Sequence, residues 1–291
     1  MKKLISKFVL SLAFAASVFA DPDISKISNS FDDLGKSFAS ALPQVTGMQN
    51  IYADAFIGKI FPTAIPHFGG GVNASLIKVD TSSLLDVFDE LGFSADGVNK
   101  SLVLPSASVD FRVGGAVLPF DVGFIFLKTP NLNFKDISLG FTTFGVDLRY
   151  AILEDGLARP GLSVGLGYLY NGMDFEYSKK NSGVKYDVGI QTLYTTVQIS
   201  KKLIIATPFA GTRFMVSSHK IDWEWNLGPV LHDRGSSSSD GFDFGNIQTQ
   251  LYAGCGFNFV VFQTTLILMA DVAHAEEDKV FSGALSFRVK L

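Results

Sequence analysis

Charged side chains that alternate with apolar ones along extended stretches are the first candidates for chemistry in this sequence. Asp110 and Arg112 lie two positions apart in one such stretch, and Asp147 and Arg149 repeat the spacing in another. Residues i and i+2 of a strand project from the same face, so each pair places an acid and a base on one side of a sheet. Such groups select solutes by size and sign where they line an open channel, and they fill a narrow barrel where they pair with one another. The predicted lumen-lining residues are Asp110, Arg112, Asp147, Arg149, Arg213 and Asp271.

The other reactive residue types form no catalytic or metal-binding motif. Cys255 is the one cysteine, which excludes an internal disulfide and a cysteine-rich zinc site. The run Gly69–Gly71 lacks the downstream lysine and hydroxyl residue of a phosphate-binding loop. We therefore predict no enzymatic activity, no metal and no cofactor. The histidines are far apart, at His67, His219, His232 and His274.

The composition favours a protein that meets lipid. Phenylalanine occurs 27 times, and charged residues make up 18% of the chain, against about 25% in a typical soluble domain. The mean hydropathy is +0.28, yet no uncharged apolar run after the amino terminus reaches the roughly 18–20 residues of a membrane helix. The formal charge is −4, and without the three lysines of residues 1–20 it is 21 − 28 = −7, which disfavours nucleic acid as a partner.

Residues 1–20, MKKLISKFVLSLAFAASVFA, have the pattern of an export signal. Three lysines precede a short apolar stretch that ends in small residues, with Val18 and Ala20 placed for cleavage before Asp21. We predict that a signal peptide is removed here and that the mature chain leaves the cytoplasm.

Residues 21–65 are predicted to form a helical segment that lies in the periplasmic mouth or plugs the lumen. Apolar residues from Ile24 to Leu42 recur at steps of three and four, which is the spacing of one helical stripe. Pro43 is expected to end this helix. Residues 51–60 fit either a helix or a strand.

From residue 66 onward the hydrophobic period changes to two, which predicts strands. In the last segment Leu285, Phe287, Val289 and Leu291 alternate with small, polar or charged residues. One face of each strand is therefore apolar and the other is not. The ten predicted strands cover 66–79, 105–118, 120–128, 136–153, 160–171, 184–200, 203–217, 243–261, 263–274 and 279–291.

The connections between these strands alternate in length. The longer ones include 80–104, 172–183 and 218–242, whereas turns near Pro119 and Phe262 are tight. Up-and-down barrels in outer membranes show this alternation, because short turns face the periplasm and longer loops face outward. Two strands change the phase of their pattern partway, which indicates bulges or excursions beyond the apolar zone; they are 136–153 and 184–200.

Only helices and closed barrels satisfy every backbone amide inside hydrocarbon. We therefore predict an all-β fold, an antiparallel up-and-down transmembrane β-barrel of about ten strands at 66–291, with eight and twelve strands as alternatives. A secreted β-sandwich explains the alternation equally well, but it explains the loop lengths and the phenylalanine excess less well. Aromatic residues near strand ends are predicted to lie at the membrane interface; the candidates are Trp223, Trp225, Tyr168 and Tyr170.

The chain resembles outer-membrane β-barrels of the Gram-negative type. The resemblance rests on the signal peptide, the succession of hairpins over 66–291 and the last strand GALSFRVKL, which ends in Leu291 where that family usually has Phe. It implies an assembly machinery that reads the last strand. The helical segment is similar to the hatch of FadL-type fatty-acid transporters, and the small size is similar to OmpW-like barrels. Some ten-stranded relatives are proteases, but the loop histidines here are explained as solvated residues.

Three functional hypotheses follow. The first is an integral outer-membrane barrel that acts as a small porin or ligand-transport channel for small hydrophobic or polar solutes. The second is a surface adhesin or structural barrel with a filled lumen that works through loops 80–104 and 218–242. The third is a soluble periplasmic lipid-binding protein whose apolar face lines a pocket.

Overall fold

The computed structural model describes residues 24–55, 57, 67–80, 82–83, 85–86, 101–115, 120–129, 131–134, 137–179, 182–227, 231–272 and 281–291. The predicted signal peptide and His274 lie outside these residues. Among the residues described, no helix has both the length and the apolar character that a membrane crossing requires. One long helix, α2 (Ile24–Gln49), precedes the strands in this part of the chain.

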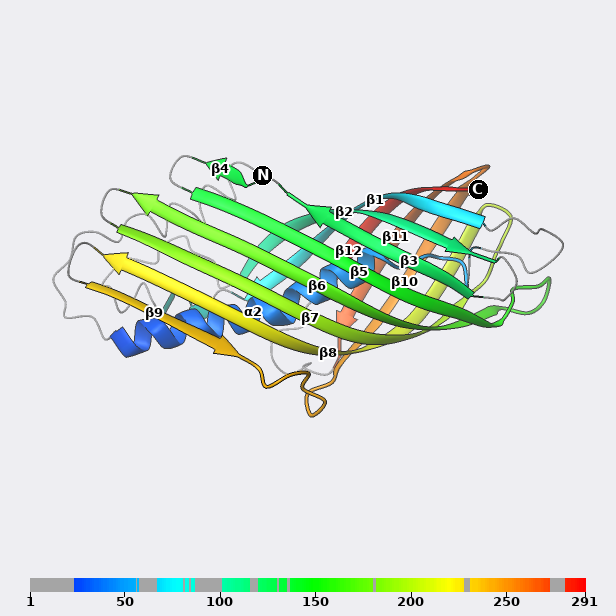
Figure 1. Ribbon diagram of the computed structural model, residues 1–291. Coiled ribbons are helices and arrows are strands. Elements are labelled where there is room, and N and C mark those ends of the chain that lie inside the picture. Colours follow the sequence, from blue (N-terminus) through cyan, green and yellow to red (C-terminus); the bar gives the residue numbers. More distant parts are fainter. Residues whose placement is uncertain are drawn as a thin grey trace.

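Ten antiparallel strands close into a ring (Figure 1). From β1 to β8 each ring strand pairs with the next, β10 follows β8, and β12 returns to pair with β1. The remaining strands lie off the ring, since β4 pairs only with β5, and β9 pairs with the far half of β8. This confirms the predicted closed barrel of about ten strands with a helix before it. The strands are β1 (His67–Asp80), β2 (Ser101–Gly114), β3 (Phe120–Lys128), β4 (Leu132–Phe134), β5 (Ile137–Leu153), β6 (Gly161–Lys179), β7 (Ser182–Ser200), β8 (Ala206–Leu227), β9 (Leu231–Ser238), β10 (Gln248–Phe259), β11 (Phe262–Asp271) and β12 (Phe281–Lys290).

Both ends of the barrel sequence meet at one end of the ring, which we call the terminus end. The backbone N–H of Phe68 donates to the carbonyl of Leu291 at 3.0 Å, and the N–H of Leu291 donates back at 2.8 Å. The short connections β2–β3, β5–β6, β7–β8 and β10–β11 lie at this end. The opposite end, where β1 finishes at Asp80 and β12 starts at Phe281, is called the loop end.

The outer surface of the ring is apolar and its interior is polar. On β11, Leu266 and Leu268 are 51% and 64% exposed on the outer face, whereas Gln263 and Thr265, which belong to the other face, are fully buried inside. A soluble sheet protein would bury the leucines and expose the glutamine. The outward apolar side chains form a band around the ring, which we call the apolar belt. Phenylalanines gather on it toward the terminus end, and two outward pairs stack with ring centroids 6.0 Å and 5.5 Å apart, Phe68 with Phe111 and Phe262 with Phe287.

The strands β5 to β8 continue past the belt at the loop end, and there the polarity of their two faces is exchanged. On β8 the outward residues change from Phe214 and Val216 to Lys220, Asp222 and Glu224 without a break in the alternation. The inward residues change from mostly polar in the ring to apolar beyond it. The strands β5, β6 and β7 show the same exchange. The environment therefore changes from lipid outside and polar lumen inside to water outside and an apolar core inside. We call this part of β5–β8, together with β9, the sheet extension.

The sheet extension corrects two predicted loops. Residues 172–183 are a hairpin in which β6 and β7 stay paired up to Lys179 and Ser182. Most of 218–242 belongs to β8 and β9, which pair from Lys220 to Leu227. Of the two explanations for the change of phase in β7, the excursion beyond the apolar zone is right, because its register with β6 is continuous. In β5 the one irregularity lies at the other end of the strand, between Ala151 and Leu153.

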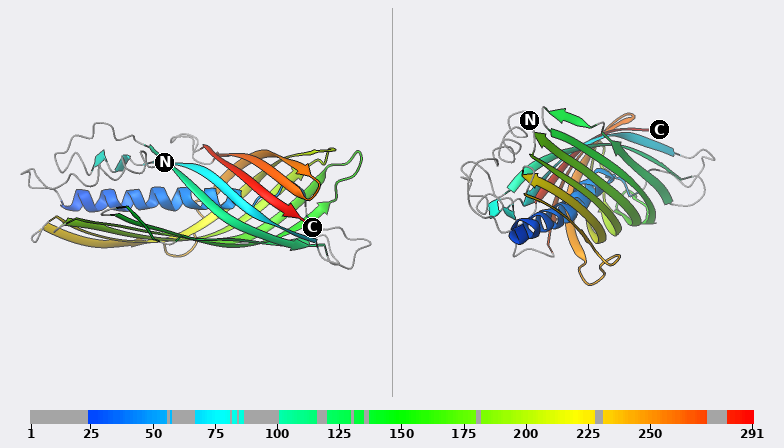
Figure 2. Two further views of the ribbon diagram at one scale, coloured as in Figure 1. Left: turned by 90° about the horizontal axis from the view of Figure 1, so that it is seen from above. Right: turned by 60° about the vertical axis from the view of Figure 1, so that its left-hand side comes forward.

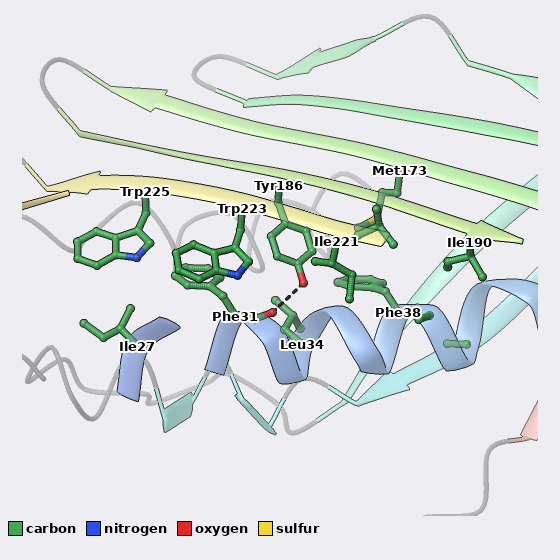
Figure 3. Packing of buried hydrophobic residues seen from close by; sticks show 13 residues of the cluster. Ile27, Phe31, Leu34, Phe38, Met173, Tyr186, Ile190, Ile221, Trp223 and Trp225 are labelled. Carbon is green, nitrogen blue, oxygen red and sulfur yellow. Dashed lines mark hydrogen bonds between the residues drawn. The ribbon is translucent and has the colours of Figure 1, made fainter. Parts of the chain in front are cut away.

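The amino-terminal half of α2 packs on the inward face of the sheet extension (Figures 1 and 3). The rings of Phe31 and Trp223 stack with centroids 6.1 Å apart, and the hydroxyl of Tyr186 donates to the carbonyl of Phe31 at 2.8 Å. Burial raises the pKa of the Tyr186 hydroxyl. The buried members of this core are Ile27, Phe31, Leu34, Phe38, Ala39, Ala41, Met173, Tyr186, Val188, Ile190, Ile221, Trp223 and Trp225.

Pro43 does not end α2, contrary to the prediction, since the helix continues to Gln49. A proline inside a helix removes one backbone hydrogen bond and crowds the preceding turn. Here the last turns enter the ring, where Met48 is fully buried against barrel residues such as Tyr252 and Ile267. Contacts with the barrel wall therefore outweigh the local preference of Pro43.

The outward face of the sheet extension places three acids in one cross-strand row. Asp174 is opposite Asp187, and Asp187 is opposite Asp222. Burial raises the pKa of Asp174, and the hydrogen bond and negative charge of Asp187 raise it further. Ion pairs of Lys185 with Asp187 and of Lys220 with Asp222 offset part of the repulsion.

Replacing Asp174 by asparagine is expected to raise the melting temperature at about pH 8, because it removes a charge that the folded state disfavours. A raised carboxyl pKa makes the charged form costly above that pKa, and the cost disappears as the pH falls through it. The gain should therefore shrink toward about pH 4, where carboxylates take up protons. Thermal melts followed by circular dichroism at several pH values check this, and an equal gain at every pH would contradict it.

Candidate functional site

The carboxyl-terminal end of α2 lies inside the ring, where barrel arginines bind its backbone carbonyls. Arg213 Nη2 donates to Gly47 O at 2.6 Å, and Arg288 donates to Gln49 O at 2.6 Å and Ile51 O at 2.8 Å. The last four carbonyls of a helix have no partner within the helix and carry the negative end of its dipole. Arginines from the wall supply both the missing donors and the opposite charge.

Two further arginines continue these contacts along the segment that follows α2. Arg149 Nη1 donates to Asp54 O at 2.7 Å and to Tyr52 O at 3.3 Å. Arg112 Nη2 donates to Asn50 O at 3.4 Å. These guanidinium groups come from four different strands, β2, β5, β8 and β12, and all are buried. We call the set Arg112, Arg149, Arg213 and Arg288 the arginine collar.

Buried carboxylates hold the collar in place. Asp121 lies between Arg112 and Arg149, and its Oδ2 accepts from Arg149 Nη2 at 2.9 Å. Asp147 accepts from Arg112 Nη2 at 2.7 Å and 2.9 Å. A buried charge is stable only with a close partner and further hydrogen bonds, and each of these aspartates has at least one guanidinium.

A carboxylate and an aromatic ring hold Arg288, the collar member on β12. Arg288 Nε donates to Asp110 Oδ2 at 2.6 Å. Tyr52, which follows α2, is fully buried with Arg288 4.0 Å and Arg112 4.8 Å from its ring centroid. Its hydroxyl donates to Asp110 Oδ1 at 3.2 Å. Tyr52 thus combines cation–π contacts with a hydrogen bond and fixes the segment in the lumen.

Gly123 allows the collar to form. It is the cross-strand neighbour of both Arg112 and Asp147 and lies between them. A Cβ at this position would come within 2.3 Å of Asp147 Oδ1 and 2.4 Å of Arg112 Nη2. The missing side chain is the space through which these two residues meet across β3.

Arg213 lies further toward the loop end and holds the helix itself. The rings of Tyr194 and Tyr252 flank its guanidinium at 5.0 Å and 5.9 Å. A Cβ at Gly47 would come within 2.1 Å of Arg213 Nη1, so only a glycine lets α2 approach the wall this closely. Gln44 of the same helix donates to Asp271 Oδ2 at 3.3 Å.

The structure places all six predicted lumen-lining residues inside the ring, buried. Arg112 bonds Asp121 and Asp147, which lie on other strands. Residues i and i+2 of one strand are about 6.6 Å apart, and the missing side chain of Gly123 lets Arg112 reach Asp147 across β3. The six are Asp110, Arg112, Asp147, Arg149, Arg213 and Asp271.

Several residues of the site were missed by sequence reasoning. Arg288 occupies the polar phase of the last strand, which is the one signal that could have identified it. Asp121 follows the turn into β3, and Tyr52 and Asn50 belong to a segment without a clear period. Asn50 Nδ2 donates to Asp147 Oδ1 at 2.5 Å, and Lys290 Nζ donates to Asp54 Oδ2 at 2.6 Å.

The prediction of interfacial tryptophans is wrong. Trp223 and Trp225 are 7% and 2% exposed and pack against α2, and Trp223 Nε1 donates to Asp32 Oδ1 at 2.8 Å. They lie on the inward phase of β8 beyond the belt, where the apolar face points away from lipid. Tyr168 and Tyr170 point outward from β6, toward the loop-end border of the belt.

The buried charged residues that form the site are arginines and aspartates. Among the described residues, no group of three or more His, Cys, Asp or Glu side chains is placed to hold a metal ion. His219 faces α2 from the sheet extension, and His232 is exposed on β9. On the described ring strands, four buried arginines stand beside four buried aspartates, Asp110, Asp121, Asp147 and Asp271, and the buried Asp54 that follows α2 pairs with Lys290. What the arrangement can do is bind the segment 44–54 tightly to the wall.

No protein family matches the sequence, and no curated protein matches it. Among solved structures, the translocator domain of autotransporter NalP from Neisseria meningitidis is similar at 7% identity and a TM-score of 0.42, covering 79% of this chain and 90% of that one. The outer membrane protease OmpT from Escherichia coli is similar at 8% identity and a TM-score of 0.38, covering 77% and 94%.

The attachment invasion locus protein Ail of Yersinia pestis is similar at 10% identity and a TM-score of 0.21, covering 78% and 97%. At these values the likenesses carry no argument about activity. The pairing of the strands, the apolar belt and the polar interior carry the assignment of the fold. The chain has the architecture of an outer-membrane β-barrel that is closed around its own amino-terminal helix.

Proposed function

We propose that this protein is a sealed outer-membrane barrel that holds a rigid structure, the sheet extension with α2, on the outer side of the membrane. This develops the second hypothesis, a surface-exposed structural or adhesive barrel with a filled lumen. The observation that carries it is the arginine collar, because four wall arginines bind the carbonyls of residues 47–54 inside the ring. To remove this segment from the lumen, several charge-assisted hydrogen bonds would have to break at once.

The location and the partners belong to the same proposal. An apolar belt of this kind is stable only against acyl chains, which supports placement in the outer membrane. The last strand, β12, closes the ring against β1, so a machinery that reads this strand would act at the seam. Surface adhesion would use the outward face of the sheet extension, where Lys185, Asp187, Asp222 and Arg234 line a hollow.

A narrow channel beside α2 is the second candidate function. The inward face of β10–β12 carries several polar residues beside the apolar ones that contact Met48, and it bears one arginine of the collar, Arg288, where the wall of β2–β5 bears two. Among the described residues, side-chain atoms of Gln250, Thr265, Ser282 and Ser286 are buried without a hydrogen-bond partner. A hydrated path along this wall would satisfy them and would pass small polar solutes.

Planar-bilayer recordings of the purified protein separate the two. The sealed barrel is expected to give no conductance steps, whereas a variant that lacks residues 24–55 is expected to give them, because the collar would then line an open lumen. Asp33→Ala, which changes an exposed side chain of α2, serves as the control and should give no conductance steps. Heat-modifiable migration on gels reports whether each variant is folded. Steady conductance of the unaltered protein would overturn the sealed barrel and favour the channel.

A further inference from the structure

The direction in which α2 passes through the ring is fixed by contacts at both of its ends. Near its start, Ser28 Oγ donates to Asp233 Oδ2 at 2.7 Å, and Asp233 lies on β9 of the sheet extension. Beyond its end, Asp54 bonds Lys290, which is one residue from Leu291 at the terminus end. The helix therefore runs from the loop end to the terminus end, and Figure 2 shows it lying lengthwise along the molecule in this sense.

The start of α2 lies beyond the apolar belt. On β6 the outward face changes from Leu166 and Tyr170 to Asp174 and Glu176, which places the border of the belt near Gly172. The core that surrounds the amino-terminal half of α2 is built from residues past this border, including Tyr186 and Trp225. With a rise of about 1.5 Å per residue, a helix of 26 residues is about 39 Å long, enough to reach from the extension into the ring.

The loop end is the side that faces away from the cell. Outer-membrane barrels have their short turns in the periplasm and their longer connections outside. Here the turn between Phe259 and Phe262 has two residues, at the terminus end. At the loop end two residues also separate β6 from β7, but the connections after Asp80 and Asp271 are longer and the strands β5–β8 extend beyond the belt. Both ends of the barrel sequence lie on the side of the short turns, which is the periplasmic side.

From these three placements we infer that the amino end of α2 is displayed on the cell surface. The inference rests on the proposed location in the outer membrane. The chain enters the membrane from outside as α2, passes down the lumen to the periplasmic end, and returns outward as β1. The barrel thereby carries its own amino-terminal segment across the membrane, and a peptide attached before Ile24 is exported with it. The surface formed by the start of α2 and β9 is then available to partners outside the cell.

Cysteine labelling in intact cells tests this with minimal disturbance. In a Cys255→Ser background, Ser25→Cys, which is exposed at the start of α2, is treated with a maleimide that cannot cross membranes. Ser238→Cys, exposed at the end of β9, is the matched outer control, and Lys202→Cys, in the β7–β8 turn, is the inner control. Ser25→Cys is expected to label as fully as Ser238→Cys before lysis, whereas Lys202→Cys labels only after lysis.

Three results would overturn the inference, and they are distinguishable. Labelling of Ser25→Cys only after lysis, with Ser238→Cys labelled before it, places the start of α2 inside the cell and leaves the sealed barrel intact. Labelling of Lys202→Cys alone in intact cells would show that the barrel has the opposite orientation in the membrane. Release of the protein from membranes by carbonate refutes the proposed location itself. An epitope inserted between Asp23 and Ile24 and detected by antibody on intact cells provides a second measurement.

Discussion

Asp121→Ala is expected to lower the free energy of unfolding by about 3–5 kcal/mol, which is the cost of removing one partner from a buried ion pair. Asp121 is fully buried and accepts hydrogen bonds from Arg112 and Arg149, two members of the collar. Without it, Arg149 keeps the carbonyls of Tyr52 and Asp54 and the ring of Tyr52, and Arg112 keeps the carboxylate of Asp147. The loss would be measured by urea unfolding in detergent, followed by the shift between the compact and the extended band on gels.

Asp33→Ala is the matched control for that substitution. Asp33 also belongs to an ion pair, with Lys36 at 2.8 Å, but both side chains are more than half exposed. Exposed pairs contribute little, so no measurable loss is expected. If Asp121→Ala unfolds at the same urea concentration as Asp33→Ala, the buried cluster does not hold the barrel together.

Phe31→Ala is expected to cost about 3–5 kcal/mol of packing between α2 and the sheet extension, as is usual for a buried aromatic side chain. Phe31 is 5% exposed and contacts Trp223 and Tyr186 from the middle of this core. Because the collar binds the other end of the helix, the loss of this packing should loosen the amino-terminal half of α2 while the ring stays closed. Limited proteolysis would then cut α2 faster, with the heat-modifiable migration preserved.

The control for Phe31→Ala is Asn29→Ala, which changes an exposed residue of the same helix. It should leave the rate of proteolysis unchanged. Equal rates for Phe31→Ala and Asn29→Ala would show that the core of the sheet extension contributes little to holding α2. Collapse of the ring together with the helix would show that the two ends of α2 are not independent.

The alternation of apolar and polar residues predicted the strands of the ring. A period of two requires only that one face of each strand be apolar and the other polar, and both faces can be identified in the sequence. The same rule failed beyond the belt, where the face toward α2 is apolar and the outer face is charged. At Lys220 and Asp222 the sequence reads as a polar loop, although the strand continues, because strands in water can be as polar outside as loops are. The alternation of Ile221, Trp223 and Trp225 with polar residues is the signal that predicts the continuation of this strand.

The members of the collar were partly predictable and their partners were not. Arg112 and Arg149 stand on the polar phase of apolar strands, which identified them as interior residues. Their ligands include carbonyls of Tyr52 and Asp54, and any residue type offers a carbonyl. Cross-strand register decides which aspartate each arginine meets, and one sequence without the pairing of its strands does not contain that information.

The position of the collar determines how the protein responds to force. In the proposed orientation, contacts around Gly47 and Asp54 hold the periplasmic end of the helix, and the end that packs on the sheet extension lies on the outer side. Tension applied from outside, as by a bound particle under flow, would run along the helix axis and reach many of these hydrogen bonds together. Bonds loaded in parallel share the tension and rupture at a higher force than bonds opened one after another, so the proposed surface role would gain resistance to pulling from this arrangement.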